Sequence, residues 1–167
     1  MQKSLINLPL HTTKSRFTMQ PQKTLRVYID ADVLFRAATA SHAHTAALVL
    51  LRMAEFTLLD VVSAVYTVEE AVGALQRHLP GEQQILLQLI ANTVRIVDDP
   101  PPALLQAHRH QAHWKDTINL AAAVHAQAHL LVTYNVRGYF PQGGSLHIMT
   151  PGQLVSASRV AIYSIQN

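Results

Sequence analysis

The fold is decided by the stretch Arg26-Val27-Tyr28-Ile29-Asp30-Ala31-Asp32-Val33-Leu34-Phe35. Val27, Tyr28 and Ile29 favour strands, and no charged residue interrupts this apolar run before Asp30. Such an uninterrupted strand is typical of the centre of a parallel sheet, because both of its faces are buried there. Asp30 then lies at the carboxyl end of the strand, where open α/β sheets bind their ligands. The stretch therefore predicts a central parallel strand that ends in a binding site.

Asp32 follows closely and admits two interpretations. Its carboxylate can cap the helix that we expect near Val33, because a side-chain oxygen accepts there from unpaired backbone amides. It can also join Asp30 in a site. For Asp30 the alternative is a turn acid, although Gly or Asn would serve a turn without burying a charge.

Strands and helices alternate along the rest of the chain. Further strands are predicted at residues 56–62, 94–97, 129–133 and 146–149. Helices are predicted at residues 33–40, 45–55, 65–79, 81–92, 103–110, 117–128 and from residue 151. Thr45 and Ser63 are expected to cap helices, and Pro151 to open the last helix behind Thr150. This order predicts a three-layer α/β/α sandwich with a central, mainly parallel sheet of about five strands.

The length of 167 residues fits one domain. Residues 1–24 are basic, contain no acid and lack a sustained hydrophobic period, so we expect a disordered arm. Residues 25–157 are expected to form the domain, and residues 158–167 a C-terminal tail.

Composition narrows the class of protein. The chain lacks both an apolar run of about 18 residues and a secretory signal, so we expect a cytoplasmic protein without a membrane span. It contains no Cys, so a metal would have to be held by carboxylates or imidazoles. The net charge of +3 fits a partner that carries phosphate, although this margin is common among enzymes.

Polar residues recur at the ends of the predicted strands and at the starts of helices. In chain order they are Asp30, Glu69 or Glu70, Asp116 and Asn135. The chain has only ten acids, so this placement suggests that several of them gather in one pocket. Clustered carboxylates repel one another unless a hard cation lies between them, which indicates Mg²⁺ or Mn²⁺.

The pattern resembles PIN-domain nucleases of the kind found as the toxin (VapC-like) in bacterial toxin–antitoxin pairs. The resemblance covers roughly residues 25–155. The segment from Val27 to Leu34 is similar to the family's opening strand and first acid, the family more often having Asn where Asp32 stands. Ser63, then Glu69-Glu70 and Leu75, resemble its second segment, whose spacing favours Glu70 as the acid.

The most specific part of the resemblance lies in the second half of the chain. The segment Lys115-Asp116-Thr117-Ile118-Asn119-Leu120-Ala121-Ala122-Ala123 resembles the third acid and its helix. Leu131-Val132-Thr133-Tyr134-Asn135 and Phe140-Pro141 resemble the closing Thr-x-Asn element. Several PIN proteins have Asp where Asn135 stands, so whether one or two metal ions bind stays open.

This resemblance implies a Mg²⁺- or Mn²⁺-dependent endoribonuclease that leaves a 5′-phosphate. It implies Asp30, Glu70 and Asp116 as metal ligands, with Asp32 as a further candidate. Thr133 and Asn135 would complete the site through water molecules or hold the nucleophile. The implied partners are single-stranded or structured RNA, a cognate antitoxin and, as an option, a second copy of the chain. Candidates for binding the RNA backbone are Lys115, Arg137 and Arg36.

Two other functions compete with this interpretation. Asp30-Ala31-Asp32-Val33 also has the spacing of haloacid-dehalogenase-like phosphatases, and Asp98-Asp99 resembles their later acid pair. No Lys occurs between Lys23 and Lys115, however, where that family requires one. A PIN-like module that binds RNA or a partner without cleaving is the second alternative.

Each site residue also has a purely structural interpretation. Glu69 and Glu70 can be solvated surface acids, Asp116 a helix cap, and Thr133 with Asn135 ordinary turn residues. Among His108, His110 and His113, the last two would fall on one face with Asp116 and could suit zinc if the segment were helical, but contact with solvent or the RNA backbone is the simpler interpretation.

Overall fold

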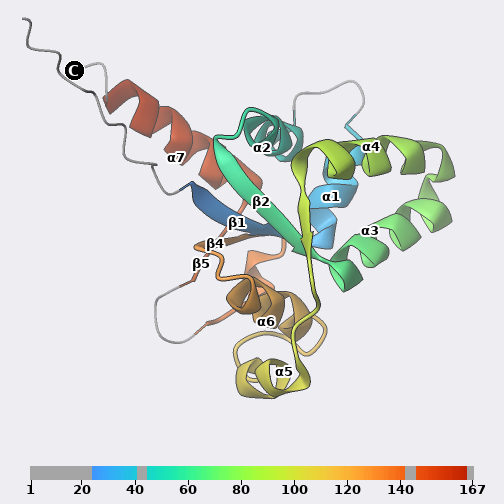
Figure 1. Ribbon diagram of the computed structural model, residues 1–167, viewed down its shortest axis with the longest axis vertical. Coiled ribbons are helices and arrows are strands. Elements are labelled where there is room, and N and C mark those ends of the chain that lie inside the picture. Colours follow the sequence, from blue (N-terminus) through green and yellow to red (C-terminus); the bar gives the residue numbers. More distant parts are fainter. Residues whose placement is uncertain (1–23, 41–44, 142–145, 165–167) are drawn as a thin grey trace, which may run out of the picture.

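The computed structural model describes residues 24–40, 45–141 and 146–164 (Figure 1). Within these residues the strands form one sheet in the order β3-β2-β1-β4-β5, and all neighbouring strands are parallel. This confirms the predicted α/β class and the central position of the opening strand. The strands are β1 (Leu25–Ile29), β2 (Leu59–Ala64), β3 (Arg95–Val97), β4 (Leu130–Val132) and β5 (His147–Met149).

Helices cover both faces of this sheet. Figure 1 shows α1 to α4 and α7 on one side and α5 with α6 on the other. Short 3₁₀ turns η1 (Pro80–Glu82) and η2 (Val136–Gly138) complete the elements. The helices are α1 (Ala31–Ala38), α2 (Ala46–Glu55), α3 (Val65–His78), α4 (Gln83–Thr93), α5 (Pro102–His108), α6 (Thr117–His125) and α7 (Pro151–Ser164).

The central strand β1 is buried on both faces, as its composition predicts. Val27 and Ile29 are inaccessible and pack on the side of α1 to α4, whereas Tyr28 packs on the side of α6. The strand order reverses between β1 and β4, because the chain crosses from β3 to β4 over the opposite face. Such a switch point opens a crevice beyond the carboxyl ends of the two strands. Asp30 and Asn135 follow these two strands.

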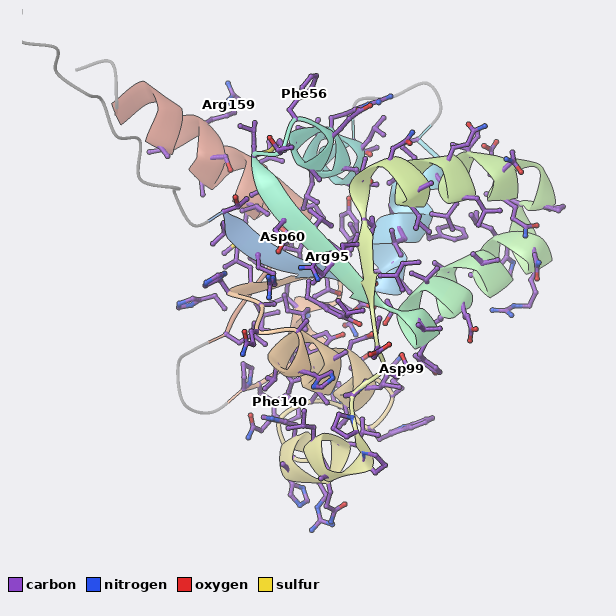
Figure 2. All side chains as sticks on the ribbon, viewed as in Figure 1. Phe56, Asp60, Arg95, Asp99, Phe140 and Arg159 are labelled. Atoms are coloured by element: carbon purple, nitrogen blue, oxygen red, sulfur yellow. The ribbon has the colours of Figure 1, made fainter. Side chains whose placement is uncertain are left out.

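A cluster of ion pairs joins strands β1, β2 and β3. Asp60 of β2 accepts from Arg26 Nε at 2.7 Å and from Arg95 Nη2 at 2.8 Å (Figure 2). Burial acts to raise the pKa of Asp60, but the two guanidinium groups outweigh it, so the net pKa is lowered. Exposed ion pairs add little stability, so the cluster mainly supports the register Arg26 to Asp60.

Two predicted caps are corrected by the structure. Ser63 lies inside β2, because the strand continues to Ala64, which occupies the N-cap position of α3. The Ser63 Oγ donates instead to the Ile29 carbonyl at 3.0 Å. Helix α1 begins at Ala31, so Asp30 and not Asp32 is its N-cap. The caps of the other two helices agree with the prediction, since Thr45 Oγ1 accepts from Leu48 N and Thr150 Oγ1 from Gln153 N.

Some predictions concern residues outside the described part of the chain. The basic arm falls almost entirely in residues 1–23, and the predicted break at residues 41–44 lies outside as well. Helix α7 continues to Ser164, past residue 157. In the part of the chain that the structure describes, no helix is long and apolar enough to cross a membrane.

Candidate active site

Four acids meet in a crevice of about 320 Å³ at the switch point between β1 and β4. They come from the end of β1, the first turn of α1, the middle of α3 and the residue before α6. The residues around this acid crevice are Asp30, Ala31, Asp32, Glu70, Lys115, Asp116, Asn119 and Asn135. The structure thus brings together acids that lie far apart in the sequence.

Asp30 is the most firmly held of the four. Its side chain is 7% exposed. Oδ1 accepts from Ala31 N at 2.7 Å and from Asn119 Nδ2 at 2.9 Å, and Oδ2 accepts from Tyr139 Oη at 2.7 Å. Since a carboxylate offers about four acceptor positions, these bonds leave one free, on Oδ2.

A buried polar network orients the donors of Asp30. Asn119 Oδ1 accepts from Thr67 Oγ1 at 2.6 Å and from Tyr28 Oη at 3.3 Å, which directs the Asn119 amide nitrogen toward Asp30. Burial is the main cause that raises the pKa of Tyr28 and of Tyr139, so both hydroxyls keep their protons.

Sequence reasoning missed the role of two members of this network. Asn119 is a buried polar residue among the apolar residues of helix α6, and this was a usable signal. Tyr139 follows η2 in a loop, where no hydrophobic period marks a buried residue.

Asp32 lies beside Asp30, and only one of its two carboxylate oxygens accepts hydrogen bonds from the described residues. Its Oδ2 accepts from Thr133 Oγ1 at 3.2 Å and from Tyr134 N at 3.0 Å. Its Oδ1 is buried and has no hydrogen-bond partner among the residues that the structure describes. Burial, and then the charge of Asp30, raise the pKa of Asp32 to about 6. A buried oxygen without a partner is costly, so this atom is a candidate for binding a ligand.

Asp116 is held by the loop that follows β4. It is 8% exposed, and its Oδ2 accepts from Asn135 Nδ2 at 3.1 Å. It occupies the N-cap position of α6 without making a capping bond, so capping does not account for its carboxylate. Burial and the charge of Asp30 raise its pKa, against the opposing effect of Lys115.

Gly138 permits this close packing. A Cβ at this position would overlap Asp116 Oδ2 and lie 2.6 Å from Asn135 Nδ2, so only glycine fits. The Gly138 carbonyl accepts from His113 N at 2.8 Å, which fastens η2 to the segment before α6.

The structure distinguishes Glu70 from Glu69. Glu70 borders the acid crevice, whereas Glu69 does not. Burial and the charges of Asp30 and Asp116 raise the pKa of Glu70, and Lys115 and Arg77 oppose them. The negative charges of Asp30 and Asp116 therefore repel the Glu70 carboxylate.

The predicted cations are distributed around the crevice. Lys115 is exposed and borders the crevice directly. Arg36 lies over the Tyr134 ring, 5.7 Å from its centroid, and borders an adjoining pocket with Asp32 and Glu70. Arg137 is exposed in η2.

The acids fit a hard divalent cation by their chemistry. Mutual repulsion contributes to the raised pKa of Asp32, Glu70 and Asp116, and free acceptor positions remain on Asp30 and Asp32. As the side chains stand, however, no group of three or more His, Cys, Asp or Glu among the described residues is arranged to hold a metal ion. That finding covers the histidines of residues 108–113 as well as the acids.

The acid pair required by the phosphatase interpretation lies elsewhere. Asp98 and Asp99 follow β3, which is separated from β1 by β2, and neither borders the crevice. Asp99 Oδ1 instead accepts from Tyr66 N at 2.9 Å, near the start of α3. The structure therefore gives this pair no place beside Asp30.

Comparison with solved structures gives the class of fold. The chain is similar to PAE2754 from Pyrobaculum aerophilum, with a TM-score of 0.56, 13% identity, and coverage of 80% of this chain and 94% of that one. It is also similar to the structure of FitAB bound to the IR36 DNA fragment, with a TM-score of 0.51, 16% identity and coverage of 75% and 94%. The chain accordingly has the PIN-like fold that the sequence resemblance predicted.

A weaker likeness is to VapC20 of Mycobacterium tuberculosis, described as a sarcin-ricin loop cleaving toxin. The TM-score is 0.46 at 14% identity, over 63% of this chain and 86% of that one. The sequence itself matches no protein-family model and no curated protein.

Proposed function

We propose that the chain is a metal-dependent endoribonuclease that hydrolyses RNA phosphodiester bonds at the acid crevice. The observation that carries this proposal is the buried Oδ1 of Asp32, which has no partner although three further carboxylates line the same crevice. A carboxylate cluster of this kind is suited to bind a divalent cation beside a phosphate. The PIN-like fold supports the assignment.

In this proposal Asp30, Glu70 and Asp116 hold Mg²⁺ or Mn²⁺, with Asp32 as a further ligand. A bound ion of this type supplies a water molecule of lowered pKa and positive charge beside the phosphate. Asn119 and Tyr139 fix the rotamer of Asp30, and Asn135 fixes that of Asp116. Such supporting hydrogen bonds typically change metal affinity or activity by roughly 10- to 100-fold.

The remaining residues act on the nucleophile and on the RNA. Thr133 Oγ1 and Tyr134 N hold Oδ2 of Asp32, so that its free Oδ1 can accept a hydrogen bond from the attacking water. Lys115 binds the phosphate, and Arg36 and Arg137 bind the neighbouring backbone. Water attacks the phosphorus in line and forms the new P–O bond, the P–O3′ bond breaks, and the departing 3′ oxygen takes up a proton, which leaves a 5′-phosphate on one product and a 3′-hydroxyl on the other.

A second candidate function is an RNA- or partner-binding module without catalysis. It is favoured by the observation that the described acids do not form a ready metal-ligand group. It predicts RNA binding that is independent of metal and no cleavage.

The decisive experiment incubates the protein with an end-labelled single-stranded RNA in Mg²⁺, in Mn²⁺ and in EDTA. The proposal expects cleavage with either ion, none with EDTA, and products that carry a 5′-phosphate. Asp116→Asn should abolish cleavage, because a neutral amide is a poor ligand for a hard cation although it can still accept from Asn135. Intact RNA under all three conditions, from a folded protein that binds it, would favour the non-catalytic module.

We further propose that the protein is a cytoplasmic toxin with a cognate antitoxin. Expression of the chain alone should then arrest growth, and co-expression of a small protein encoded beside it should relieve the arrest. Normal growth of cells that produce active nuclease would contradict the toxin role. Sedimentation would decide between a monomer and a homodimer.

A further inference from the structure

Trp114, next to Lys115 of the acid crevice, is the most exposed of the large hydrophobic residues in the described part of the chain. It is 89% exposed, although Trp is usually buried in large part. Trp114 is the only Trp of the chain, and it directly precedes Lys115 and Asp116. An aromatic face left open next to a candidate site is a candidate contact for a ligand.

Trp114 borders a cleft of about 440 Å³ that adjoins the acid crevice. Its wall includes Tyr66, Leu105, Arg109, Trp114, Lys115 and Ile118. Lys115 also borders the acid crevice, so the two hollows share a wall. Among the described residues that line this cleft there is no Asp or Glu. We call it the aromatic cleft.

Both aromatic residues project from anchored backbone. Tyr66 N donates to Asp99 Oδ1 at 2.9 Å, and Figure 2 shows Asp99 on the strand-to-helix connection that leads toward α5. The segment that carries Trp114 is fastened on both sides, because His113 N donates to the Gly138 carbonyl and Asp116 N to the His113 carbonyl, each at 2.8 Å. The backbone that carries the two rings is therefore held in place.

We propose that the aromatic cleft binds an unstacked nucleobase of single-stranded RNA next to the phosphate held at the acid crevice. The base stacks on Trp114 and Tyr66, while Lys115 and Arg109 contact the phosphates on either side of it. This proposal deepens the proposed nuclease function and rests on RNA reaching the acid crevice. Aromatic faces combined with cations are the usual means of binding single-stranded RNA.

The charge of the cleft favours RNA over an acidic or basic protein segment. Its two cations would attract phosphates, and its other walls are apolar or neutral, as a planar base requires. The shared Lys115 gives a continuous path from one phosphate to the next. Double-stranded RNA would not fit, because its bases are stacked and unavailable.

The single Trp provides a direct test, because its fluorescence reports contact with the cleft. The full chain is titrated in EDTA, which prevents cleavage, with a short single-stranded RNA, the same RNA as a duplex, and an abasic ribose-phosphate strand of equal length. We expect the single strand to quench the emission. The duplex and the abasic strand should quench it little, and the abasic strand should bind at least about tenfold more weakly.

Variants of Trp114 distinguish stacking of the base from general electrostatic attraction of the RNA. Trp114→Ala should weaken binding of labelled single-stranded RNA roughly tenfold or more, whereas Trp114→Phe should retain most of the affinity. Phe56→Ala is the matched control, because Phe56 is also an exposed aromatic residue (71%) but lies at the end of α2, on the opposite side of the sheet from α5 and α6 (Figure 2). It should bind RNA as the unmodified chain does.

The outcomes distinguish this proposal from the nuclease function. Metal-dependent cleavage without quenching, or equal binding of the abasic strand, would overturn the base site and leave the nuclease intact. Quenching without any cleavage would support the base site and count against the nuclease. Unchanged RNA binding by Trp114→Ala would overturn the base site and point to a protein partner for Trp114.

Discussion

Tyr139 Oη donates a 2.7 Å hydrogen bond to Asp30 Oδ2, and the two residues are 109 positions apart in the sequence. The bond joins the loop after η2 to the end of β1 across the switch point. The orientation of Asp30 therefore depends on the loop that contains Tyr139. Replacing Tyr139 by Phe removes only the hydroxyl group and tests this dependence.

Tyr139→Phe should lower both stability and metal affinity. A hydrogen bond to a charged group contributes roughly 1.5–3 kcal/mol, so the melting temperature should fall by several degrees. Because Asp30 also loses an orienting donor, the increase in melting temperature caused by Mg²⁺ should shrink, and the Mg²⁺ concentration for half-maximal cleavage should rise. A variant that is less stable but has unchanged Mg²⁺ dependence would show a structural role only.

Asp32→Asn should stabilise the metal-free protein at neutral pH. The pKa of Asp32 rises from 3.8 to about 6 on folding, so the folded chain holds the proton more tightly than the unfolded one. Its contribution to stability is therefore fully present below pH 3.8 and is lost as the pH rises through about 6. The variant should melt a few degrees higher at pH 7.5, and the difference should vanish near pH 4, as thermal melts in EDTA would measure.

Asp30→Asn is the contrasting variant and should lower the melting temperature at both pH values. Three donors point at the Asp30 carboxylate, so an amide in its place loses hydrogen bonds to a charged acceptor, and its nitrogen would force the Tyr139 hydroxyl to accept instead of donate. Equal stabilisation by both substitutions would contradict the different environments assigned to these two acids.

Glu70→Gln should reduce cleavage by at least about 100-fold, because the substitution removes a charged metal ligand. Glu69→Gln is its matched control, since Glu69 is the adjacent acid on α3 and does not border the crevice. Cleavage of labelled RNA under saturating Mg²⁺ measures both. Equal losses in the two variants would remove Glu70 from the site.

Gly138→Ala should destabilise η2 and disrupt the site. The new Cβ would overlap the Asp116 carboxylate, and relief of such overpacking typically costs about 1–3 kcal/mol. The melting temperature should drop, and cleavage should fall with it.

Gly73→Ala in α3 is a suitable control for a glycine substitution. Its Cβ would meet only the flexible end of Arg77, at 3.3 Å, and alanine favours a helix interior by roughly 0.5–1 kcal/mol. This variant should melt slightly higher and keep its activity. A Gly138→Ala protein with an unchanged melt would show that the loop relaxes freely.

The fold was largely predictable because it depends on local patterns. The apolar run that ends at Asp30 specified a central parallel strand, and the alternation of strands and helices specified the layers. Boundaries were less accurate. Ser63 was misassigned as a cap because its hydroxyl is satisfied by the Ile29 carbonyl of a neighbouring strand, a partner that local sequence does not reveal.

The candidate site was only partly predictable. Asp30, Asp116 and Asn135 could be named because each follows or precedes a recognisable element. The resemblance favoured Glu70 over Glu69, but only the rotation of α3 about its axis, which is set by how Ala71 and Leu75 pack, shows that Glu70 borders the crevice. The hydrogen bond from Tyr139 to Asp30 could not be predicted, because loop residues show no hydrophobic period that would mark Tyr139 as buried.

The sequence by itself determined that polar residues recur at the ends of buried strands and at the starts of helices, since burial and periodicity are properties of neighbouring residues. Only the tertiary structure decided which of these residues face one another. It showed that Asp30 both caps α1 and borders the crevice, and that Oδ1 of Asp32 is buried without a hydrogen-bond partner among the described residues. The physical reason is that β1 and β4 become neighbours only after the chain has crossed both faces of the sheet, so the Asp30 to Tyr139 bond and the Asp32 to Thr133 bond form between segments more than 100 residues apart.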